Sequence, residues 1–191
     1  MRKSIAWLSI PILIAAAPVA GQQLDVTAMV PVASPAGAGT RNLLFGVLTP
    51  VAGTTQMVDI VASPLPVSGT VQSGEFRYNV GGVRGLDFTV TMPSQLTAPG
   101  ADPLTVTSNG NQYGGYCVSA AAMCALTGFN PASGQNVRVC RVTFFIWCSP
   151  FSAFPGGTIL RVYVGGLLLV PPDARGGVYT GTATLTIVQV L

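Results

Sequence analysis

The residues best suited to chemistry in this chain are its four cysteines, which lie close together in the second half of the sequence. They are Cys117, Cys124, Cys140 and Cys148. A cysteine acts as a nucleophile or metal ligand in its thiolate form, or it is oxidised to a disulfide. The chain has no histidine, the usual base of a nucleophilic triad and the commonest transition-metal ligand, and it has no C-x-x-C spacing. We therefore expect disulfides, with no metal site and no cofactor.

Among the three possible pairings, we favour the local one, Cys117 with Cys124 and Cys140 with Cys148. Residues 119–122 can turn between the first two cysteines. The second pair carries a geometric condition, because eight residues of continuous strand span about 26 Å, whereas bridged Cα atoms lie within about 7 Å. Either the chain bends after Cys140, or the pairing is crossed.

The six acidic residues are the other candidates for catalysis. A glycosidase needs two carboxyl groups about 5 to 10 Å apart in a cleft. Asp59, Glu75 and Asp87 occupy polar positions of alternating segments, so we expect them on the solvent faces of different strands. The chain also lacks a D-x-D-x-D calcium loop, and its Gly-Gly pairs lack a strand-to-helix context for binding phosphate. The sequence thus favours a non-enzymatic protein without catalytic residues.

The N-terminus has the pattern of a secretory signal peptide over residues 1–21. Arg2 and Lys3 precede an apolar segment at 5–17, which is followed by small residues. Pro11 and Pro18 interrupt this run, which is shorter than the about 20 residues of a transmembrane helix. We expect cleavage after residue 20 or 21, export to the periplasm, cell surface or medium, and no membrane span afterwards.

Few charges remain once the signal peptide is removed. With Arg2 and Lys3 gone, the formal net charge falls from +3 to +1. No basic patch for nucleic acid remains. A surface with so few charges does little to prevent association, so self-association or contact with other surface proteins is favoured. The sequence does not identify a ligand.

Alternation of apolar and polar residues predicts strands throughout residues 42–191. Residues 75–80 and 86–92 alternate cleanly across Gly81 and Gly82 and predict a hairpin. The parity of apolar residues changes near residue 140, which predicts a bend there. No helical period is sustained outside the signal peptide. Many short strands with Gly- and Pro-rich turns predict an all-β fold, an antiparallel immunoglobulin-like Greek-key β-sandwich with a disulfide-bearing insertion.

The last thirty residues predict two strands, one from residue 162 to 170 and one after residue 178. In the second, Tyr179, Leu185 and Ile187 share one face, and threonines fill the other. We expect the two strands to pair in one antiparallel sheet and to bury these three side chains.

Two segments are candidates for contacts with other molecules. Residues 22–41 form an N-terminal extension, with an alternating segment at 22–32 and a Pro/Gly-rich linker. This segment either pairs within its own sheet or inserts into a groove of the next copy. Residues 144–147 are apolar on both faces, which fits a strand covered on both sides or an intermolecular interface. The candidate interface residues are Leu24, Val26, Ala28, Val30, Phe145, Trp147 and Phe151.

Four short motifs carry a resemblance to a known family. They are L-F-G at 44–46, a strand ending in M-P at 92–93, G-G-L at 165–167 and G-V-Y-T-G-T at 177–182. In order and spacing, residues 43–191 resemble the secreted bacterial family known as domain of unknown function 4402. The resemblance implies an exported β-sandwich, distantly similar to pilus and spore-coat subunits, with no known catalysis. The chain departs from the family pattern between Tyr113 and Pro155.

We therefore expect an exported, non-enzymatic structural protein, a cell-surface, pilin-like or coat subunit. The alternative is a monomeric, adhesin-like binding module whose aromatic loop at 144–154 grips a glycan or a protein. Stacking of a sugar on Trp147 or Phe151 requires these rings to be exposed, so their burial decides whether the alternative holds.

Overall fold

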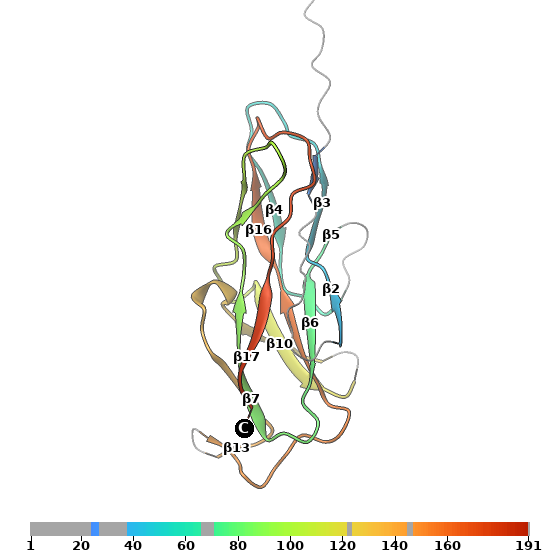
Figure 1. Ribbon diagram of the computed structural model, residues 1–191, viewed down its shortest axis with the longest axis vertical. Helices are drawn as coiled ribbons and strands as arrows, with labels where there is room; N and C mark the ends of the chain where they lie inside the picture. Colours follow the sequence, from blue (N-terminus) through green and yellow to red (C-terminus); the bar gives the residue numbers. More distant parts are fainter. Residues whose placement is uncertain (1–23, 27–37, 66–70, 122–123, 145–146, 191) are drawn as a thin grey trace, which may run out of the picture.

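The computed structural model describes residues 24–26, 38–65, 71–121, 124–144 and 147–190. These residues form antiparallel strands and loops with one short 3-10 turn, η1 (Pro131–Ser133), and no α-helix. The described part of the chain therefore contains no helix able to cross a membrane. The molecule is elongated, as Figure 1 shows. The predicted all-β sandwich is confirmed.

The strands follow one another along the whole described chain. In order they are β1 (Leu24–Val26), β2 (Ala38–Arg41), β3 (Leu44–Leu48), β4 (Gln56–Ile60), β5 (Val71–Gln72), β6 (Gly74–Asn79), β7 (Gly85–Thr91), β8 (Gln95–Leu96), β9 (Leu104–Thr107), β10 (Gly114–Ser119), β11 (Thr127–Phe129), β12 (Val137–Cys140), β13 (Thr143–Phe144), β14 (Trp147–Cys148), β15 (Ile159–Val164), β16 (Gly166–Val170) and β17 (Thr184–Val190).

One long stretch of chain, β15 followed by β16, runs through two successive sheets. β15 lies between β10 and β6 in the order β11-β10-β15-β6-β2, and β16 lies between β4 and β9 in the order β4-β16-β9-β8. Gly165 joins them, and its N–H donates to the carbonyl of Tyr113 at 2.8 Å. A Cβ at Gly165 would clash with the carbonyl oxygen of Ile60, so this junction requires glycine.

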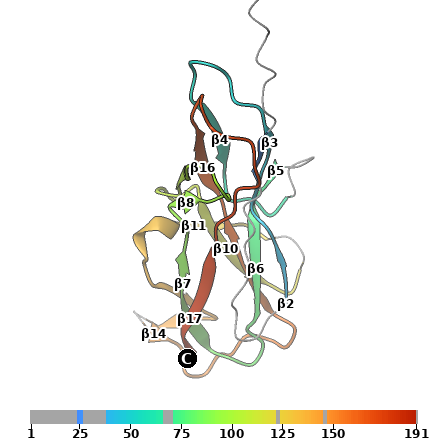
Figure 2. The ribbon, with the colours of Figure 1, turned by 45° about the horizontal axis from the view of Figure 1, so that its top comes forward.

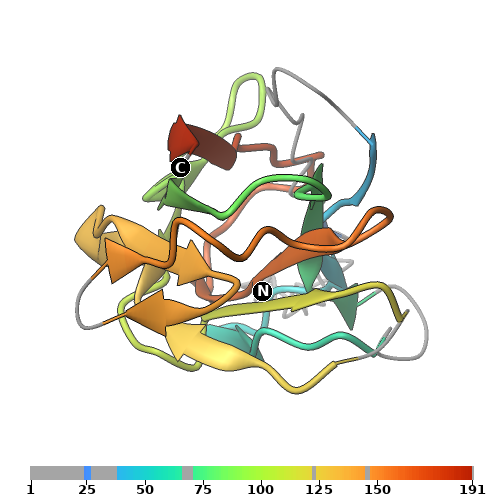
Figure 3. The same ribbon diagram turned by 90° about the horizontal axis from the view of Figure 1, so that it is seen from below.

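A second layer, the sheet β12-β7-β17, packs across the core from the layer that contains β15, as the view along the molecule in Figure 3 shows. Leu185 of β17 lies opposite Val90 of β7. The ring of Phe88 on β7 meets the rings of Tyr116 and Phe129 edge-on, with centroids 5.6 Å and 5.7 Å away. The alternating apolar residues of the two layers thus close one core.

The two C-terminal strands do not pair with each other, so that prediction is wrong. β16 pairs with β4 and β9, whereas β17 pairs with β7 in the other layer. Tyr179 and Leu185 are buried as expected, and Ile187 is partly buried. Alternation shows which face of a strand is apolar. It does not show in which layer the strand lies, because the apolar faces of both layers are buried in the same core.

The predicted hairpin of β6 and β7 is also wrong. β6 pairs with β15 and β2, and β7 pairs with β12 and β17. The connection between β6 and β7 is held instead by a distant loop. Val80 N–H donates to Thr158 at 3.0 Å, and Gly82 N–H donates to Phe154 at 2.8 Å. The chain therefore crosses from one layer to the other.

The described part of the N-terminal extension belongs to the sandwich. β1 pairs antiparallel with β3 of its own chain, with Leu24 opposite Leu48 and Val26 opposite Gly46. β2, in the segment expected to be a linker, pairs with β6. Ala28 and Val30 lie outside the described residues, as do the side chains of Leu24 and Val26.

Candidate binding site at the disulfide tip

The second disulfide closes a small hairpin after β12. Cys140 and Cys148 are bridged with their Cα atoms 5.1 Å apart. The chain bends after Cys140 and returns through β13 and β14, which pair Thr143 with Cys148 and Phe144 with Trp147. The bend that this disulfide needs is therefore confirmed. We call residues 140–144 and 147–155 the disulfide tip; β14 marks it in Figure 2, at the end of the molecule away from β4 and β16.

The first disulfide pairs Cys117, near the end of β10, with Cys124 before β11, and their Cα atoms are 6.1 Å apart. Both pairings are the local ones favoured from the sequence. The described chain therefore has no free cysteine. A disulfide sulfur has no thiolate, so these residues hold loops in place and do not act as nucleophiles.

Hydrogen bonds and one buried ring anchor the tip to the sandwich. Phe154 N–H donates to the carbonyl of Val83 at 2.7 Å, and Arg141 N–H donates to the carbonyl of Arg84 at 3.0 Å. The side chain of Phe154 is buried in the core. The tip is thus fixed at both of its ends, and a fixed loop presents its outer side chains in a defined direction.

Two aromatic rings of the tip point into solvent. Trp147 is 64 % exposed and Phe151 is 96 % exposed, so the condition set for the binding-module alternative is met. Phe144 and Trp147 do not lie along one continuous strand, because they face each other in the antiparallel pair of β13 and β14. Phe145 lies outside the described residues.

An open hollow of about 640 Å³ lies between the tip and the ends of β10 and β15. It is lined by Val118, Ser119, Ala120, Cys140, Arg141, Val142, Phe154, Pro155 and Thr158. Its volume is within the about 300 to 1,000 Å³ of typical ligand sites. The sequence did not reveal this hollow, because three segments far apart in the chain build it.

The charges beside the hollow are positive. Arg141 lines it, and Arg84 is bonded to Arg141 through the backbone. Both side chains are exposed. The ion pairs found in the described chain belong to Arg77, Arg138 and Arg161, so neither Arg84 nor Arg141 has a carboxylate partner there. The tip residue Arg141 and its backbone partner Arg84 are therefore exposed cations without a carboxylate partner, and the same tip carries the exposed rings of Trp147 and Phe151.

Glu75 is 5 % exposed and Asp87 is 4 % exposed, so their predicted solvent positions are wrong. Glu75 accepts from Arg77 at 2.9 Å and from the Tyr163 hydroxyl at 3.3 Å. Asp87 accepts from Arg138 at 2.8 Å, and this hydrogen bond lowers the pKa of Asp87. Glu75 is thus satisfied by Arg77 of its own strand and by Tyr163 of β15, and Asp87 is satisfied by Arg138 of β12. Asp59 is exposed, as expected.

These carboxylates do not form a catalytic pair in one cleft. Glu75 lies on β6 and Asp87 on β7, in different layers, and each is held by arginine. Burial is the main cause of the raised pKa of Tyr163 beside Glu75. Nowhere in the described ranges do three or more Cys, Asp or Glu side chains gather closely enough to hold a metal ion. The arrangement fits charge neutralisation within the fold.

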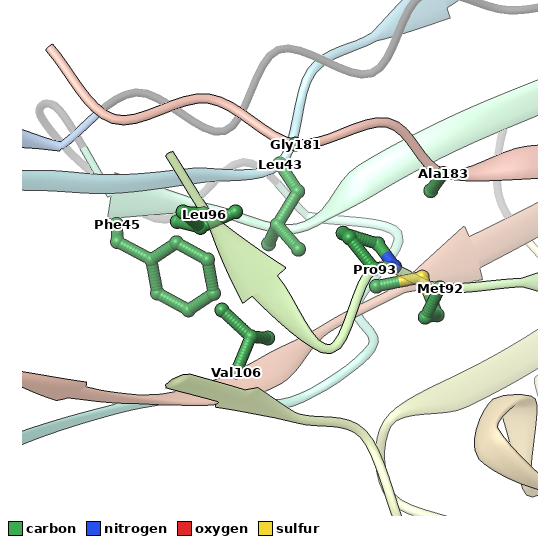
Figure 4. Close-up of a pocket in the computed structure, with 8 residues that line it drawn as sticks. All are labelled: Leu43, Phe45, Met92, Pro93, Leu96, Val106, Gly181 and Ala183. Carbon is green, nitrogen blue, oxygen red and sulfur yellow. The ribbon is translucent and has the colours of Figure 1, made fainter. Parts of the chain in front are cut away.

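A second, smaller pocket opens between the layers near the other end of the molecule. Figure 4 shows the residues that line it: Leu43, Phe45, Met92, Pro93, Leu96, Val106, Gly181 and Ala183. Its volume is about 10 Å³, about what one water molecule needs. A Cβ at Gly181 would lie 2.7 Å from a methyl carbon of Leu96. This pocket is a seam of the core and holds no ligand-sized space.

No protein-family model, curated protein or solved structure matches the chain. The family resemblance drawn from the sequence motifs therefore stays an expectation, and the geometry of the tip is the basis for a functional proposal.

Proposed function

We propose that the protein is an exported, non-enzymatic surface protein that binds a ligand through its disulfide tip. The observation that carries the proposal is the exposure of Trp147 and Phe151 on a loop that a disulfide and buried Phe154 hold in place. Large aromatic side chains on a rigid support supply much contact area at little entropic cost, which is why they dominate binding hot spots. A ligand that covers these rings removes apolar surface from water.

The two disulfides support export. Disulfides form and persist in oxidising compartments outside the cytosol, and both bridges here close loops beside the proposed site. This agrees with the signal-peptide pattern of the N-terminal sequence, which lies outside the described residues. The proposed place of action is the periplasm, the cell surface or the medium.

A glycan array probed with the secreted protein tests the proposal. We expect the protein to bind a subset of glycans and the double variant Trp147→Ala/Phe151→Ala to lose this binding. The matched control is Met57→Ala, which removes a side chain that is 70 % exposed on β4. Binding that survives in the double variant would contradict a role for the tip, and failure of the protein to bind any glycan would contradict a glycan as its ligand.

A second candidate function is a structural subunit that assembles by exchange of β1. Two observations favour it. β1 is held to β3 by a ladder of only three residues, and β1 belongs to a different sheet from β2, which follows it after segment 27–37. The same main-chain bonds form equally well when β1 comes from another copy, as in domain swapping and strand addition.

Assembly is tested by running the protein, isolated from its host without boiling, on an SDS gel. A ladder of multimers is expected, and deletion of residues 22–32 should leave monomer. The opposite result, a single monomer band that the deletion does not change, would remove this candidate and leave the binding role.

A further inference from the structure

We infer that the disulfide tip takes an acidic polysaccharide, whose carboxylates pair with Arg84 and Arg141 and whose sugar rings stack on Trp147 and Phe151. The inference rests on the binding role proposed above, and it adds the chemical class of the ligand. It is drawn from three features of the tip and its surroundings: the side chains of Arg84 and Arg141, which have no ion-pair partner among the described residues, the hollow beside Arg141, and the exposed rings of the tip.

The two arginines are brought together by strand pairing. Cys140 lies opposite Gly85 in the ladder of β12 and β7. The next residue of one strand and the preceding residue of the other are Arg141 and Arg84, and a backbone hydrogen bond of 3.0 Å joins them. Two exposed guanidinium groups thus start from adjacent backbone positions at the end of the sandwich.

Charge complementarity indicates an anionic partner. The nearest carboxylate along β7, that of Asp87, is already held by two hydrogen bonds from Arg138, at 2.9 Å and 2.8 Å. Arg84 and Arg141 have no such partner among the described residues. A guanidinium binds a carboxylate through two parallel N–H donors, which gives a directional and strong contact.

The hollow beside Arg141 has the mixed lining that a sugar unit requires. Phe154 and Val142 supply apolar surface, and Ser119 and Thr158 supply hydroxyl groups. The Ser119 hydroxyl accepts from Ala121 N–H at 2.9 Å, which leaves its own proton to donate. The Thr158 hydroxyl donates to Pro155 at 2.8 Å, which leaves its oxygen to accept.

The exposed rings favour a sugar polymer over a small anion. The face of an aromatic ring is the negative part of its quadrupole, so it attracts the weakly positive C–H groups on the face of a sugar ring. Trp147 and Phe151 lie on the same tip as Arg141, and one ligand must span several groups to cover them. An anionic bilayer would also attract arginine and aromatic side chains, but it does not account for a concave, hydroxyl-lined site.

The test is isothermal titration of the secreted protein with alginate oligosaccharides, which carry one carboxylate on each sugar, and with neutral dextran oligosaccharides. We expect binding of alginate that weakens as salt rises, and little binding of dextran. Arg84→Gln/Arg141→Gln and Trp147→Ala/Phe151→Ala should each weaken alginate binding at least tenfold. Arg175→Gln, which removes an exposed arginine bonded to Gly100, and Met57→Ala should change it less than twofold.

Four outcomes separate the ligand class from the binding role. Equal binding of dextran and alginate, or full binding by the arginine variant, would overturn the acidic class and leave the binding role in place. No binding of either sugar and none on the glycan array would overturn both. Binding to phosphatidylglycerol vesicles without binding to alginate would overturn the polysaccharide in favour of a membrane. Circular dichroism and the unfolding midpoint of each variant verify that it is folded.

Discussion

The sulfur of Cys148 lies directly over Gly85, the first residue of β7. A Cβ on Gly85 would overlap this sulfur and the carbonyl oxygen of Val139, and it would come within 3.3 Å of the Cα of Cys140. Gly85 is paired with Cys140 in the ladder of β12 and β7. The missing side chain therefore leaves the space in which the disulfide packs against the sandwich.

Replacing this glycine should displace the tip. We expect Gly85→Ala to lower the free energy of unfolding by about 1–3 kcal/mol, the usual cost of forcing a methyl group into a packed site. Urea unfolding followed by circular dichroism measures the loss. The matched control is Gly156→Ala, because a Cβ there would meet nothing within 4 Å. Equal midpoints for the two variants would contradict the close packing of Cys148 on Gly85.

The disulfide of the tip should contribute substantially to stability. Its partners are separated by 8 positions in the sequence, and loop-closure entropy predicts a loss of about 2.5 kcal/mol when such a short loop is opened. We expect the variant Cys140→Ser/Cys148→Ser to show this loss in urea unfolding. Limited trypsin digestion should then cut after Arg141, which the intact hairpin protects. An unchanged midpoint and unchanged digestion would show that the hairpin holds without its bridge.

The sequence located most strands because alternation is a local property. Residues 86–92 alternate strictly, and β7 (85–91) covers all of this stretch except residue 92. The local disulfides were also predictable, since a short separation favours closure and the change of parity near residue 140 indicated a bend. Both inferences need only the order of residues along a few positions.

Strand pairing was not predictable in the same way. The connection at Gly81 and Gly82 could form either a hairpin or a crossing between layers. The hydrogen bonds that hold it in a crossing are accepted by Phe154 and Thr158, which lie far along the chain. Buried charges depend on pairing too. Arg138 reaches Asp87 because the two residues lie opposite each other in the ladder of β12 and β7, and that register is a product of the complete fold.

Only part of the site at the disulfide tip was predictable, because some of its residues come together through strand pairing. Trp147 and Phe151 were identified from the sequence because they lie in an aromatic run beside cysteines. Arg84 and Arg141 were not, since 57 positions separate them along the chain and only the ladder of β12 and β7 brings their backbones together. A constellation that combines distant segments becomes visible only with the tertiary structure.

Stability should fall in acid through Asp87. The hydrogen bond from Arg138 lowers the pKa of Asp87 in the folded state, so the folded protein releases this proton more readily than the unfolded chain, whose Asp pKa is about 3.9. The stabilisation is therefore present above about pH 4 and is lost as the pH falls through the folded pKa. Urea midpoints at pH 7 and pH 3 measure it.

The variant Asp87→Asn should lose most of this pH dependence, because an amide does not titrate. It should be less stable than the parent at pH 7, and the difference between the two should shrink at pH 3. Asp173→Asn, at an exposed turn position, serves as the control and should follow the parent at both values. A variant that retains the full drop between pH 7 and pH 3 would assign the acid sensitivity to other groups.

Glu75 should be needed to neutralise a buried arginine. The side chain of Arg161 is 9 % exposed and its guanidinium lies 3.8 Å from the Glu75 carboxylate. Glu75→Gln keeps the shape and the hydrogen bond with Tyr163 but removes the charge, so Arg161 loses its counter-ion. Breaking a buried ion pair from one side costs about 3 kcal/mol or more, and we expect a loss of this size in urea unfolding.

The double variant Glu75→Gln/Arg161→Met distinguishes charge from packing. If the loss in Glu75→Gln comes from the unpaired charge of Arg161, removal of that charge should restore part of the stability, as replacement of buried ion pairs by apolar residues commonly does. If the loss comes from disturbed packing around Tyr163, the two substitutions should add to a larger loss. Recovery of stability in the double variant, with no such recovery for Asp173→Asn/Arg161→Met, would assign the effect to the ion pair of Glu75 and Arg161.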